Sequence, residues 1–196
     1  MASLQTLTKS FSGWVFFCCC CCLPLLLTSP LPPKGAGLAS TTHHACKLRK
    51  INFQLPYIRN RTYTLAKMVQ VSDEDTENRL IGQQIYVNIK ENNRCYMMKR
   101  IVEIVVKDVL SEAKGQYPYV EEVSQFLACL TSELKRCEFS GHGEHVEKNL
   151  EEMKSKMIQL GENGKTKAIG ELDLLFDYLE NACTDAPKKG ASKKKN

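Results

Sequence analysis

Two long segments of the chain carry hydrophobic residues at helical spacing. The residues recur at intervals of three and four, which places their side chains on one face of an α-helix. They are Val120, Val123, Leu127, Leu130 and Leu134 in the first segment, and Val146, Leu150, Met153, Met157 and Leu160 in the second. Two glycines in Ser140–Gly143 interrupt the chain between the segments. Because each stripe has to be buried against other elements, the pattern predicts two amphipathic helices of a bundle.

The segment from Asn93 to Leu110 is more apolar than either stripe and leaves only a narrow polar strip. Its many β-branched residues keep a β-strand open as an alternative. Its length of 18 residues favours a helix, because strands usually end near 5–6 residues. We therefore predict a helix at the centre of the bundle.

Shorter patterns predict two helices earlier in the chain. Residues 53–69 form a mixed helix, with Pro56 near its start, where a helix tolerates proline. Residues 79–89 form a short helix with four apolar residues on one face, Leu80, Ile81, Ile85 and Ile89. The stretch 72–77 between them has no apolar residue and is predicted to be an exposed loop.

The last predicted helix follows a turn at Gly161–Gly164 and ends at Cys183. Its buried face is formed by Ile169, Leu172, Leu175, Phe176 and Leu179. No internal repeat and no strand-and-turn pattern occurs. The predicted fold class is therefore all-α, a bundle of about six helices.

The N-terminus predicts export. Lys9 precedes an uncharged apolar run from Trp14 to Leu27, and Gly37–Ala39 offers a small-residue cleavage site. We predict a signal peptide over residues 1–39 and a secreted, extracellular protein. The alternative is a retained membrane anchor, lipidated at the cysteines 18–22. The run is shorter than the ~20 residues that span a bilayer and contains Pro24, which disfavours this alternative.

The formal charge of +5 is concentrated at the ends of the chain. Five lysines follow residue 187, so residues 184–196 are predicted to be a disordered basic tail. Residues 40–183, the predicted domain, carry −1. A body of this charge has no basic footprint for a phosphate backbone, so no nucleic acid is expected as a partner.

Five of the ten cysteines lie in the predicted signal peptide. The other five are Cys46, Cys95, Cys129, Cys137 and Cys183. Disulfides are the default use of cysteine in an exported chain. Because five is odd, one thiol remains free or pairs with another chain, and the count alone leaves both options open.

No pattern of residues predicts catalysis, a cofactor or a metal site. The pair His142 and His145 flanks a glycine-rich break, whereas ligand histidines need a rigid element. Asn60-Arg61-Thr62 is a sequon for N-glycosylation in an exported chain. Asn93 and Asn181 belong to the rarer cysteine form, which is blocked if Cys95 and Cys183 form disulfides.

The segment from Lys167 to Phe176, followed by Asn181-Ala-Cys183, resembles the final helix of the interleukin-10 family of helical cytokines. The resemblance covers nearly all of Cys46 to Cys183, as in a divergent vertebrate member of that family. Upstream it rests on Asn52–Thr62 with Leu65–Lys67, on Arg79–Gly82, on Arg94–Lys99, and on Pro118-Tyr119 with Glu122-Val123 and Phe126–Ala128.

The resemblance implies a secreted six-helix cytokine stapled by two disulfides, Cys46–Cys137 and Cys95–Cys183. Cys129 is then left as a free, partly buried thiol. It also implies binding of two class II cytokine receptor chains, which activates Janus kinases and STAT factors, in epithelial defence and repair. A further partner that the resemblance implies is a soluble receptor-like binding protein. The five lysines of the basic tail suggest a weak contact with sulfated polysaccharide, with a solvated tail without a partner as the favoured alternative.

The matched positions imply two receptor-binding sets. The specific, high-affinity chain is expected to contact Thr76, Arg79, Lys167, Gly170 and Glu171. The shared chain, the interleukin-10 receptor beta subunit, is expected to contact Tyr57, Asn60, Arg61, Tyr119 and Glu122. Solvated side chains without a partner remain the alternative for each residue. For Arg79→Ala and Glu171→Ala we expect weaker binding of the specific chain without a lower melting temperature.

Two other classes share the export signal and the helices. A secreted carrier of apolar ligands needs a cavity, and a membrane-active host-defence protein needs its basic residues along a helix face. Here the positive charge lies in the tail instead. Glu77-Asn78 and Asp177 depart from the residues expected for the resemblance, so the interface with the specific chain can differ there.

Overall fold

The computed structural model describes residues 46–75 and 77–184. The predicted signal peptide, residues 40–45 with His43 and His44, the predicted receptor contact Thr76, and residues 185–196 lie outside the described part. All described residues belong to one folded unit.

The described residues form helices and contain no strand. The α-helices are α1 (Lys50–Phe53), α2 (Pro56–Gln70), α3 (Arg94–Ile104), α4 (Val120–Glu133), α5 (Glu144–Gln159), α6 (Glu162–Gly170) and α7 (Leu172–Cys183). Short 3₁₀ segments cover Gln83–Tyr86 (η1) and Glu91–Asn93 (η2), and a π-helical segment (η3, Val105–Leu110) continues α3. The predicted all-α bundle is confirmed, with six longer helices and the single turn α1.

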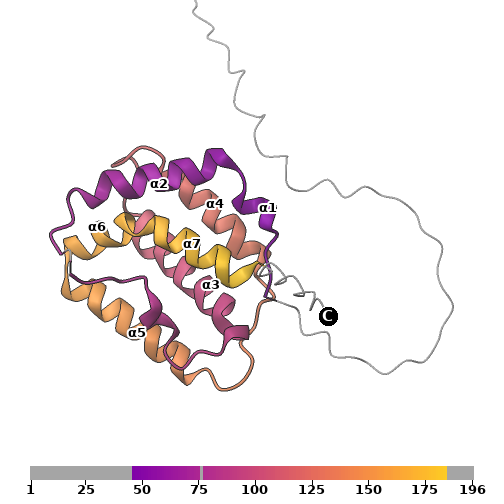
Figure 1. The fold of residues 1–196 in the computed structure, drawn as a ribbon. Coiled ribbons are helices and arrows are strands. Elements are labelled where there is room, and N and C mark those ends of the chain that lie inside the picture. Colours follow the sequence, from indigo (N-terminus) through magenta and orange to yellow (C-terminus); the bar gives the residue numbers. More distant parts are fainter. Residues whose placement is uncertain (1–45, 76, 185–196) are drawn as a thin grey trace, which may run out of the picture. The chain divides into compact units, whose positions relative to one another are not determined.

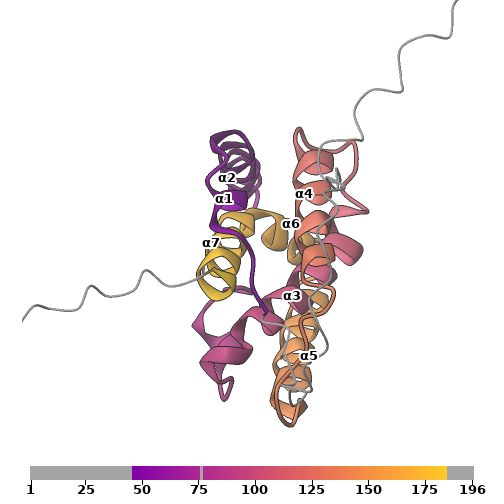
Figure 2. The same ribbon diagram turned by 90° about the vertical axis from the view of Figure 1, so that its right-hand side faces the viewer.

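Figure 2 shows α1, α2 and α7 on one side and α4 and α5 on the other. In Figure 1, α2 runs along the top of the bundle, above α7 and α3. Met97, Met98, Ile101 and Val102 of α3 are completely buried, which confirms the predicted central helix. No helix of the described part is long and apolar enough to cross a membrane.

The segment 79–89 differs from the prediction because it contains only the 3₁₀ turn η1. Its four apolar side chains are buried, as the pattern requires. Its backbone groups, however, find partners outside the segment. Glu171 accepts hydrogen bonds from the N–H groups of Leu80 and Ile81, and the Asn149 amide donates to the carbonyls of Ile85 and Val87. These side chains satisfy backbone groups that have no partner within the segment.

The predicted final helix is divided into α6 and α7 at Glu171. Its predicted N-terminal turn is also shorter than expected, because α6 begins at Glu162 and includes Gly164. A Cβ atom on Gly164 would overlap the carbonyl oxygen of Met157, so this glycine permits close packing of α6 on α5. Of the two glycines at the predicted turn, Gly161 is the one with a positive φ, +56°, which glycine adopts readily.

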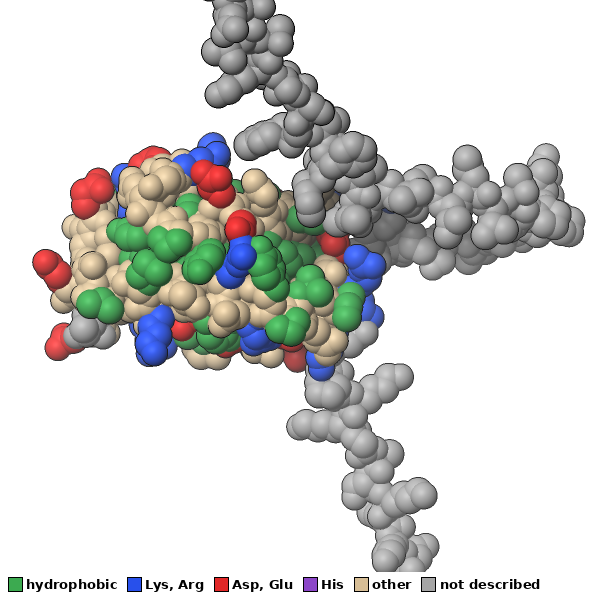
Figure 3. Space-filling view, turned by 90° about the horizontal axis from the view of Figure 1, so that it is seen from above, with side chains coloured by type: hydrophobic (Ala, Val, Ile, Leu, Met, Phe, Trp, Pro, Cys, Tyr) green, Lys and Arg blue, Asp and Glu red, His purple; other side chains and the backbone are tan. Residues whose placement is uncertain are grey.

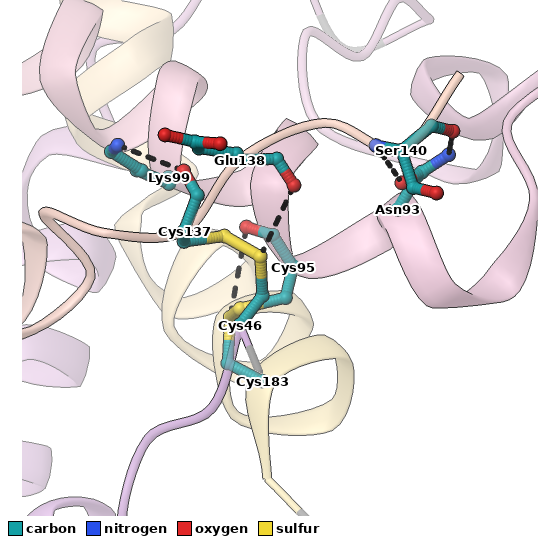
Figure 4. The surroundings of a disulfide bond; sticks show 8 residues. All are labelled: Cys46, Asn93, Cys95, Lys99, Cys137, Glu138, Ser140 and Cys183. Carbon is teal, nitrogen blue, oxygen red and sulfur yellow. Dashed lines mark hydrogen bonds between the residues drawn. A yellow bond between two sulfur atoms is a disulfide. The ribbon is translucent and has the colours of Figure 1, made fainter. Parts of the chain in front are cut away.

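Two disulfides lie beside each other at one end of the bundle (Figure 4). They join Cys46 to Cys137 and Cys95 to Cys183, the pairs implied by the resemblance. Between them, the N–H of Leu48 donates to the carbonyl of Cys183 at 2.8 Å. The N-terminal segment and the end of α7 are therefore fixed to the same place.

Cys129 is in neither disulfide and is exposed, so the expectation of a partly buried thiol is wrong. The physical reason is its position on α4. Leu127 and Leu130 occupy the buried face of this helix, and residue 129 falls on the solvent side between them.

Candidate receptor-binding surfaces

The residues predicted to contact the shared receptor chain come together where α2 starts and α4 starts. The Tyr57 hydroxyl donates a hydrogen bond to Glu122 Oε2 at 3.0 Å. The Arg61 guanidinium forms an ion pair with the same carboxylate. Arg61 Cζ also lies 3.7 Å from the ring centroid of Tyr57 and 5.0 Å from that of Tyr119. We call Tyr57, Arg61, Tyr119 and Glu122 the α2–α4 cluster.

Tyr119 has an unusual backbone conformation, with φ at +70°. Residues other than glycine rarely adopt this left-handed conformation, and such positions cluster at functional sites. Here it ends the loop before α4 and supports a ring that stacks on Arg61. The positive φ of Tyr119 was not predicted from the sequence, because no glycine stands at this position.

The α2–α4 cluster is accessible to a partner. Tyr57 is 59% exposed and Tyr119 is 38% exposed. A hollow of 520 Å³ is lined by Pro56, Tyr57, Asn60, Arg61, Thr64 and Tyr119. Figure 3 looks onto the α2 side of the bundle, where hydrophobic side chains gather in the middle around one basic and one acidic group. Tyr and Arg are the residue types most enriched at interface hot spots.

The residues predicted to contact the specific chain are arranged differently. Lys167 is only 2% exposed. Its Nζ lies 2.7 Å from Asp73 Oδ2 and also donates to the carbonyl of Asp75. The ammonium is therefore buried between α6 and the loop 71–82, which it holds together, and does not face solvent.

Glu171 is also buried, at 7% exposure. Its carboxylate accepts hydrogen bonds from the N–H of Leu80 at 2.9 Å and of Ile81 at 2.7 Å. Burial raises the pKa of this carboxyl, against the opposing effects of the two N–H donors and of Lys167 and Arg79. These contacts argue against the expectation that Glu171→Ala leaves stability unchanged, because the substitution would leave two N–H groups without their acceptor.

The other residues of this set differ in exposure. Gly170 is buried, and its carbonyl accepts a hydrogen bond from Gln70 Nε2 at 2.6 Å. Arg79 is exposed, and its carbonyl accepts from Gln84 and Lys156. Among the described members of the predicted set, Arg79 is thus the one whose side chain is open to a partner.

Two loop-holding residues were missed by sequence reasoning. Asp73 is the carboxylate that pairs with Lys167, and Asn163 accepts a hydrogen bond from the Glu74 N–H at 3.4 Å. The only signal was the acidic stretch 72–77, whose charges call for a basic partner. Nothing in the sequence indicated that this partner is a buried lysine 94 residues further along the chain.

The family described as "Interleukin 22 IL-10-related T-cell-derived-inducible factor" matches residues 46–183 of the chain. This range runs from the first to the last disulfide-bonded cysteine. The chain belongs to the interleukin-22 family.

Members of the interleukin-22 family and a solved structure show the extent of the similarity. The chain is 40% identical to interleukin-22 of Homo sapiens over 184 residues, 93% of this chain and 99% of that one. It is 43% identical to interleukin-22b of Mus musculus over 139 residues, 70% of this chain and 78% of that one. The crystal structure of zebrafish IL-22 superimposes with a TM-score of 0.54 at 22% identity, covering 68% of this chain and 96% of that one, which shows the shared fold.

Membership of the interleukin-22 family makes the chain a cytokine of the wider interleukin-10 group. Its relatives are interleukins and not enzymes. Its partners are therefore cytokine receptors in general.

A further polar network in this interleukin-22 fold connects α2 with α7. Arg59 forms ion pairs with Glu180 and, at 3.4 Å, with Asp177, and its Cζ lies 4.9 Å from the ring centroid of Phe176. The Tyr63 hydroxyl donates to Asp177. Burial, with this hydrogen bond, raises the pKa of Tyr63 to about 12. The network holds the helix that carries Tyr57 and Arg61 against the helix that follows Glu171.

The three sequons lie in different environments. Asn60 is exposed at the rim of the hollow beside the α2–α4 cluster. Asn93 is buried and exchanges two hydrogen bonds with the backbone of Ser140, each 3.0 Å long (Figure 4). Asn181 is exposed, but the cysteine of its sequon, Cys183, is in a disulfide.

Proposed function

We propose that the protein is a secreted cytokine that brings together two class II receptor chains, the specific chain of the interleukin-22 receptor and the interleukin-10 receptor beta chain. Their association would activate Janus kinases and STAT factors, in epithelial defence and repair. The observation that carries the proposal is the α2–α4 cluster, which displays two tyrosines and an arginine at the surface of a family member.

The α2–α4 cluster is the proposed contact for the beta chain. Arg61 is held between the Tyr57 and Tyr119 rings and paired to Glu122 before any partner binds. A side chain already fixed in one position loses less conformational entropy on binding. Asn60 belongs to the same surface, so a glycan on this residue would lie at the edge of the contact.

The loop 71–82 and α6 are the proposed contact for the specific chain. Arg79, and Thr76 outside the described residues, would contact the receptor. Lys167 and Glu171 would act through the loop by holding its backbone at Asp75, Leu80 and Ile81. Gly170 would act by joining α6 to Gln70 at the end of α2. The soluble receptor-like binding protein is proposed to occupy this same face.

Export is proposed through a signal peptide over residues 1–39, which releases a chain that starts at residue 40. The length of the apolar run in residues 14–27 supports this proposal, since it is too short to span a bilayer.

The test uses epithelial cells that express both receptor chains. Recombinant protein secreted by cultured cells should cause STAT phosphorylation, and an antibody that blocks either chain should abolish it. Arg61→Ala should lower the response, whereas the matched control Lys107→Ala, an exposed residue of η3, should not. A full response with both chains blocked would contradict the proposal. An apolar ligand that copurifies with the protein would then favour the alternative function, a secreted carrier of apolar ligands.

A further inference from the structure

A pocket of about 410 Å³ lies between η1, the start of α3 and the end of α7. Small-molecule sites usually have volumes of ~300–1,000 Å³. The pocket is lined by Tyr86 of η1 and Arg94 of α3 and, from α7, by Tyr178 and Asn181. None of its lining residues belongs to either predicted receptor-binding set, so the proposed receptor contacts do not account for it.

The walls of this pocket are held in place by bonds from outside it. The disulfide between Cys95 and Cys183 joins the start of α3 to the end of α7, with the two Cα atoms 4.7 Å apart. Asn149 donates to the carbonyls of the two residues that flank Tyr86 in the sequence, which fixes the backbone of η1 at this ring. A site that is already formed loses less conformational entropy when a ligand binds.

Arg94 supplies the positive charge of the pocket. Its Cζ lies 5.0 Å from the ring centroid of Tyr86. No carboxylate of the described residues forms an ion pair with this guanidinium, and its Nε is buried without a hydrogen-bond partner. Arg59 and Arg61, by contrast, are both paired with carboxylates. The planar guanidinium fork of Arg94 is therefore open to an external carboxylate, the anion whose geometry it matches.

The two tyrosines add a flat wall and a second unpaired donor. The ring centroids of Tyr86 and Tyr178 lie 5.8 Å apart, with 32° between the ring planes. The Tyr86 hydroxyl is buried and has no hydrogen-bond partner among the described residues. Burial raises the pKa of this hydroxyl, so it stays a neutral donor. Buried donors without a partner are rare in folded proteins, and two on residues that line one pocket point to polar contacts with a ligand.

The rim of the pocket carries two amides and one carboxylate. Gln83 and Asn181 are exposed, and each amide can both donate and accept hydrogen bonds, as hydroxyl groups of a ligand require. Glu91 also lines the pocket and is exposed. Its negative charge opposes an anionic ligand, which gives the experiment below a substitution that should strengthen binding.

We infer that this pocket binds an acidic sugar, a sugar ring that carries a carboxylate. The carboxylate pairs with Arg94, the hydroxyl groups bond the amides of Gln83 and Asn181, and one face of the sugar ring lies against the tyrosine rings. The inference rests on the proposed export of the chain, since such sugars occur on cell-surface glycans and in extracellular polysaccharides. It does not depend on which receptor chains the protein binds.

Other ligand classes fit the pocket less well. An apolar ligand would cover the Arg94 guanidinium without pairing it, and burial of an unpaired charge is unfavourable. A bare carboxylate such as acetate is small for the volume of the pocket and makes no use of the rim amides. A neutral sugar leaves the guanidinium without a counter-charge.

The experiment titrates the full secreted chain, labelled with ¹⁵N, and follows its amide signals by NMR. The probes are 3′-sialyllactose, glucuronic acid, neutral lactose and benzoate. We expect an acidic sugar to shift the signals of Tyr86, Tyr178 and Asn181 with a dissociation constant on the order of 1 mM, because a few contacts have to offset the entropy lost on association. Binding of sialyllactose alone would assign the end of a glycan as the source, and binding of glucuronic acid alone would assign a uronic-acid polysaccharide.

Three variants change the charge of the pocket. Arg94→Gln should weaken binding by about tenfold or more, the usual effect of losing a charged hydrogen bond. Asn181→Asp should weaken it by about two- to fivefold, and Glu91→Gln should strengthen it by about the same factor, as expected for partly exposed charges. The matched control Arg136→Gln, which removes an exposed arginine outside the pocket, should leave the affinity unchanged. Circular dichroism should show that all variants are folded.

The inference is overturned if neither acidic sugar shifts these signals, if lactose binds as tightly as sialyllactose and glucuronic acid, or if benzoate binds and the sugars do not. It is also overturned if the affinity of folded Glu91→Gln and Asn181→Asp does not move in opposite directions. Receptor activation is not part of this readout, so a failure here leaves the proposed function untouched.

Discussion

In the α2–α4 cluster, the guanidinium of Arg61 and the carboxylate of Glu122 lie at the surface of two helices and are partly exposed. At the loop 71–82, the charged groups of Lys167 and Glu171 lie beneath the surface and hold it in place. The α2–α4 cluster thus presents side chains to solvent, whereas the loop 71–82 presents a backbone whose conformation is held by buried charged groups. Substitutions should therefore separate binding from stability at the α2–α4 cluster and couple them at the loop 71–82.

The largest effect is expected for Lys167→Met. This substitution keeps the length of the side chain but removes the ammonium between Asp73 and Asp75. Removal of one partner of a buried ion pair costs about 3–5 kcal/mol, because the other charge stays buried. Urea unfolding should show this loss, together with weakened binding of the specific receptor chain. A stable Lys167→Met protein that fails to bind would instead show that Lys167 itself contacts the receptor.

Glu171→Ala should come next. It leaves the N–H groups of Leu80 and Ile81 without an acceptor, at about 1–3 kcal/mol for each buried donor. The free energy of unfolding should fall, and the specific chain should bind more weakly as the loop loses its fixed shape. Glu171→Gln, which keeps one acceptor oxygen, should lose less. Equal melting temperatures for the wild type and Glu171→Ala would contradict the structural role.

Arg61→Ala tests the displayed surface. The ion pair with Glu122 is partly exposed, with 25% and 44% of the two side chains accessible, so its loss should lower stability by less than about 1 kcal/mol. Binding to the beta chain should weaken by about 2 kcal/mol, roughly thirtyfold, as for an interface hot spot. Surface plasmon resonance on the two receptor chains should show unchanged affinity for the specific chain. A large fall in melting temperature would show that the two surfaces do not differ in the way described.

Sequence reasoning predicted the helices that carry the α2–α4 cluster better than it predicted the backbone of the loop 71–82 and the segment after it. The stripes through Val123 and Leu150 identified α4 and α5, because helix periodicity is a local property of the sequence. The α2–α4 cluster followed from residues implied by the resemblance. The segment around Ile81 carries the same periodicity but is no α-helix, and the Ile81 N–H donates to Glu171, 90 residues away. Such a distant hydrogen bond leaves no trace in local spacing.

Gly164 illustrates the same limit on a smaller scale. Next to Gly161, it has the appearance of a turn residue in the sequence. In the structure it lies within α6, where its missing side chain lets the helix approach Met157. Glycine serves both purposes, and the local sequence does not distinguish them.

The smallest expected effect is a pH dependence that belongs to the loop surface alone. Burial raises the pKa of Glu171 above its ordinary value of 4.5. The folded protein therefore binds this proton at a higher pH than the unfolded chain does. In the window between these two pKa values the folded state holds more protons, so the contribution of Glu171 to the free energy of unfolding falls as pH rises through it. Measured by urea unfolding from pH 4 upwards, the wild type should lose stability relative to Glu171→Gln across this window and run parallel to it at higher pH. Parallel curves for Glu171→Gln and the wild type at every pH would contradict the burial of the Glu171 carboxylate beneath the loop 71–82. The contrast between this loop and the α2–α4 cluster would then be lost.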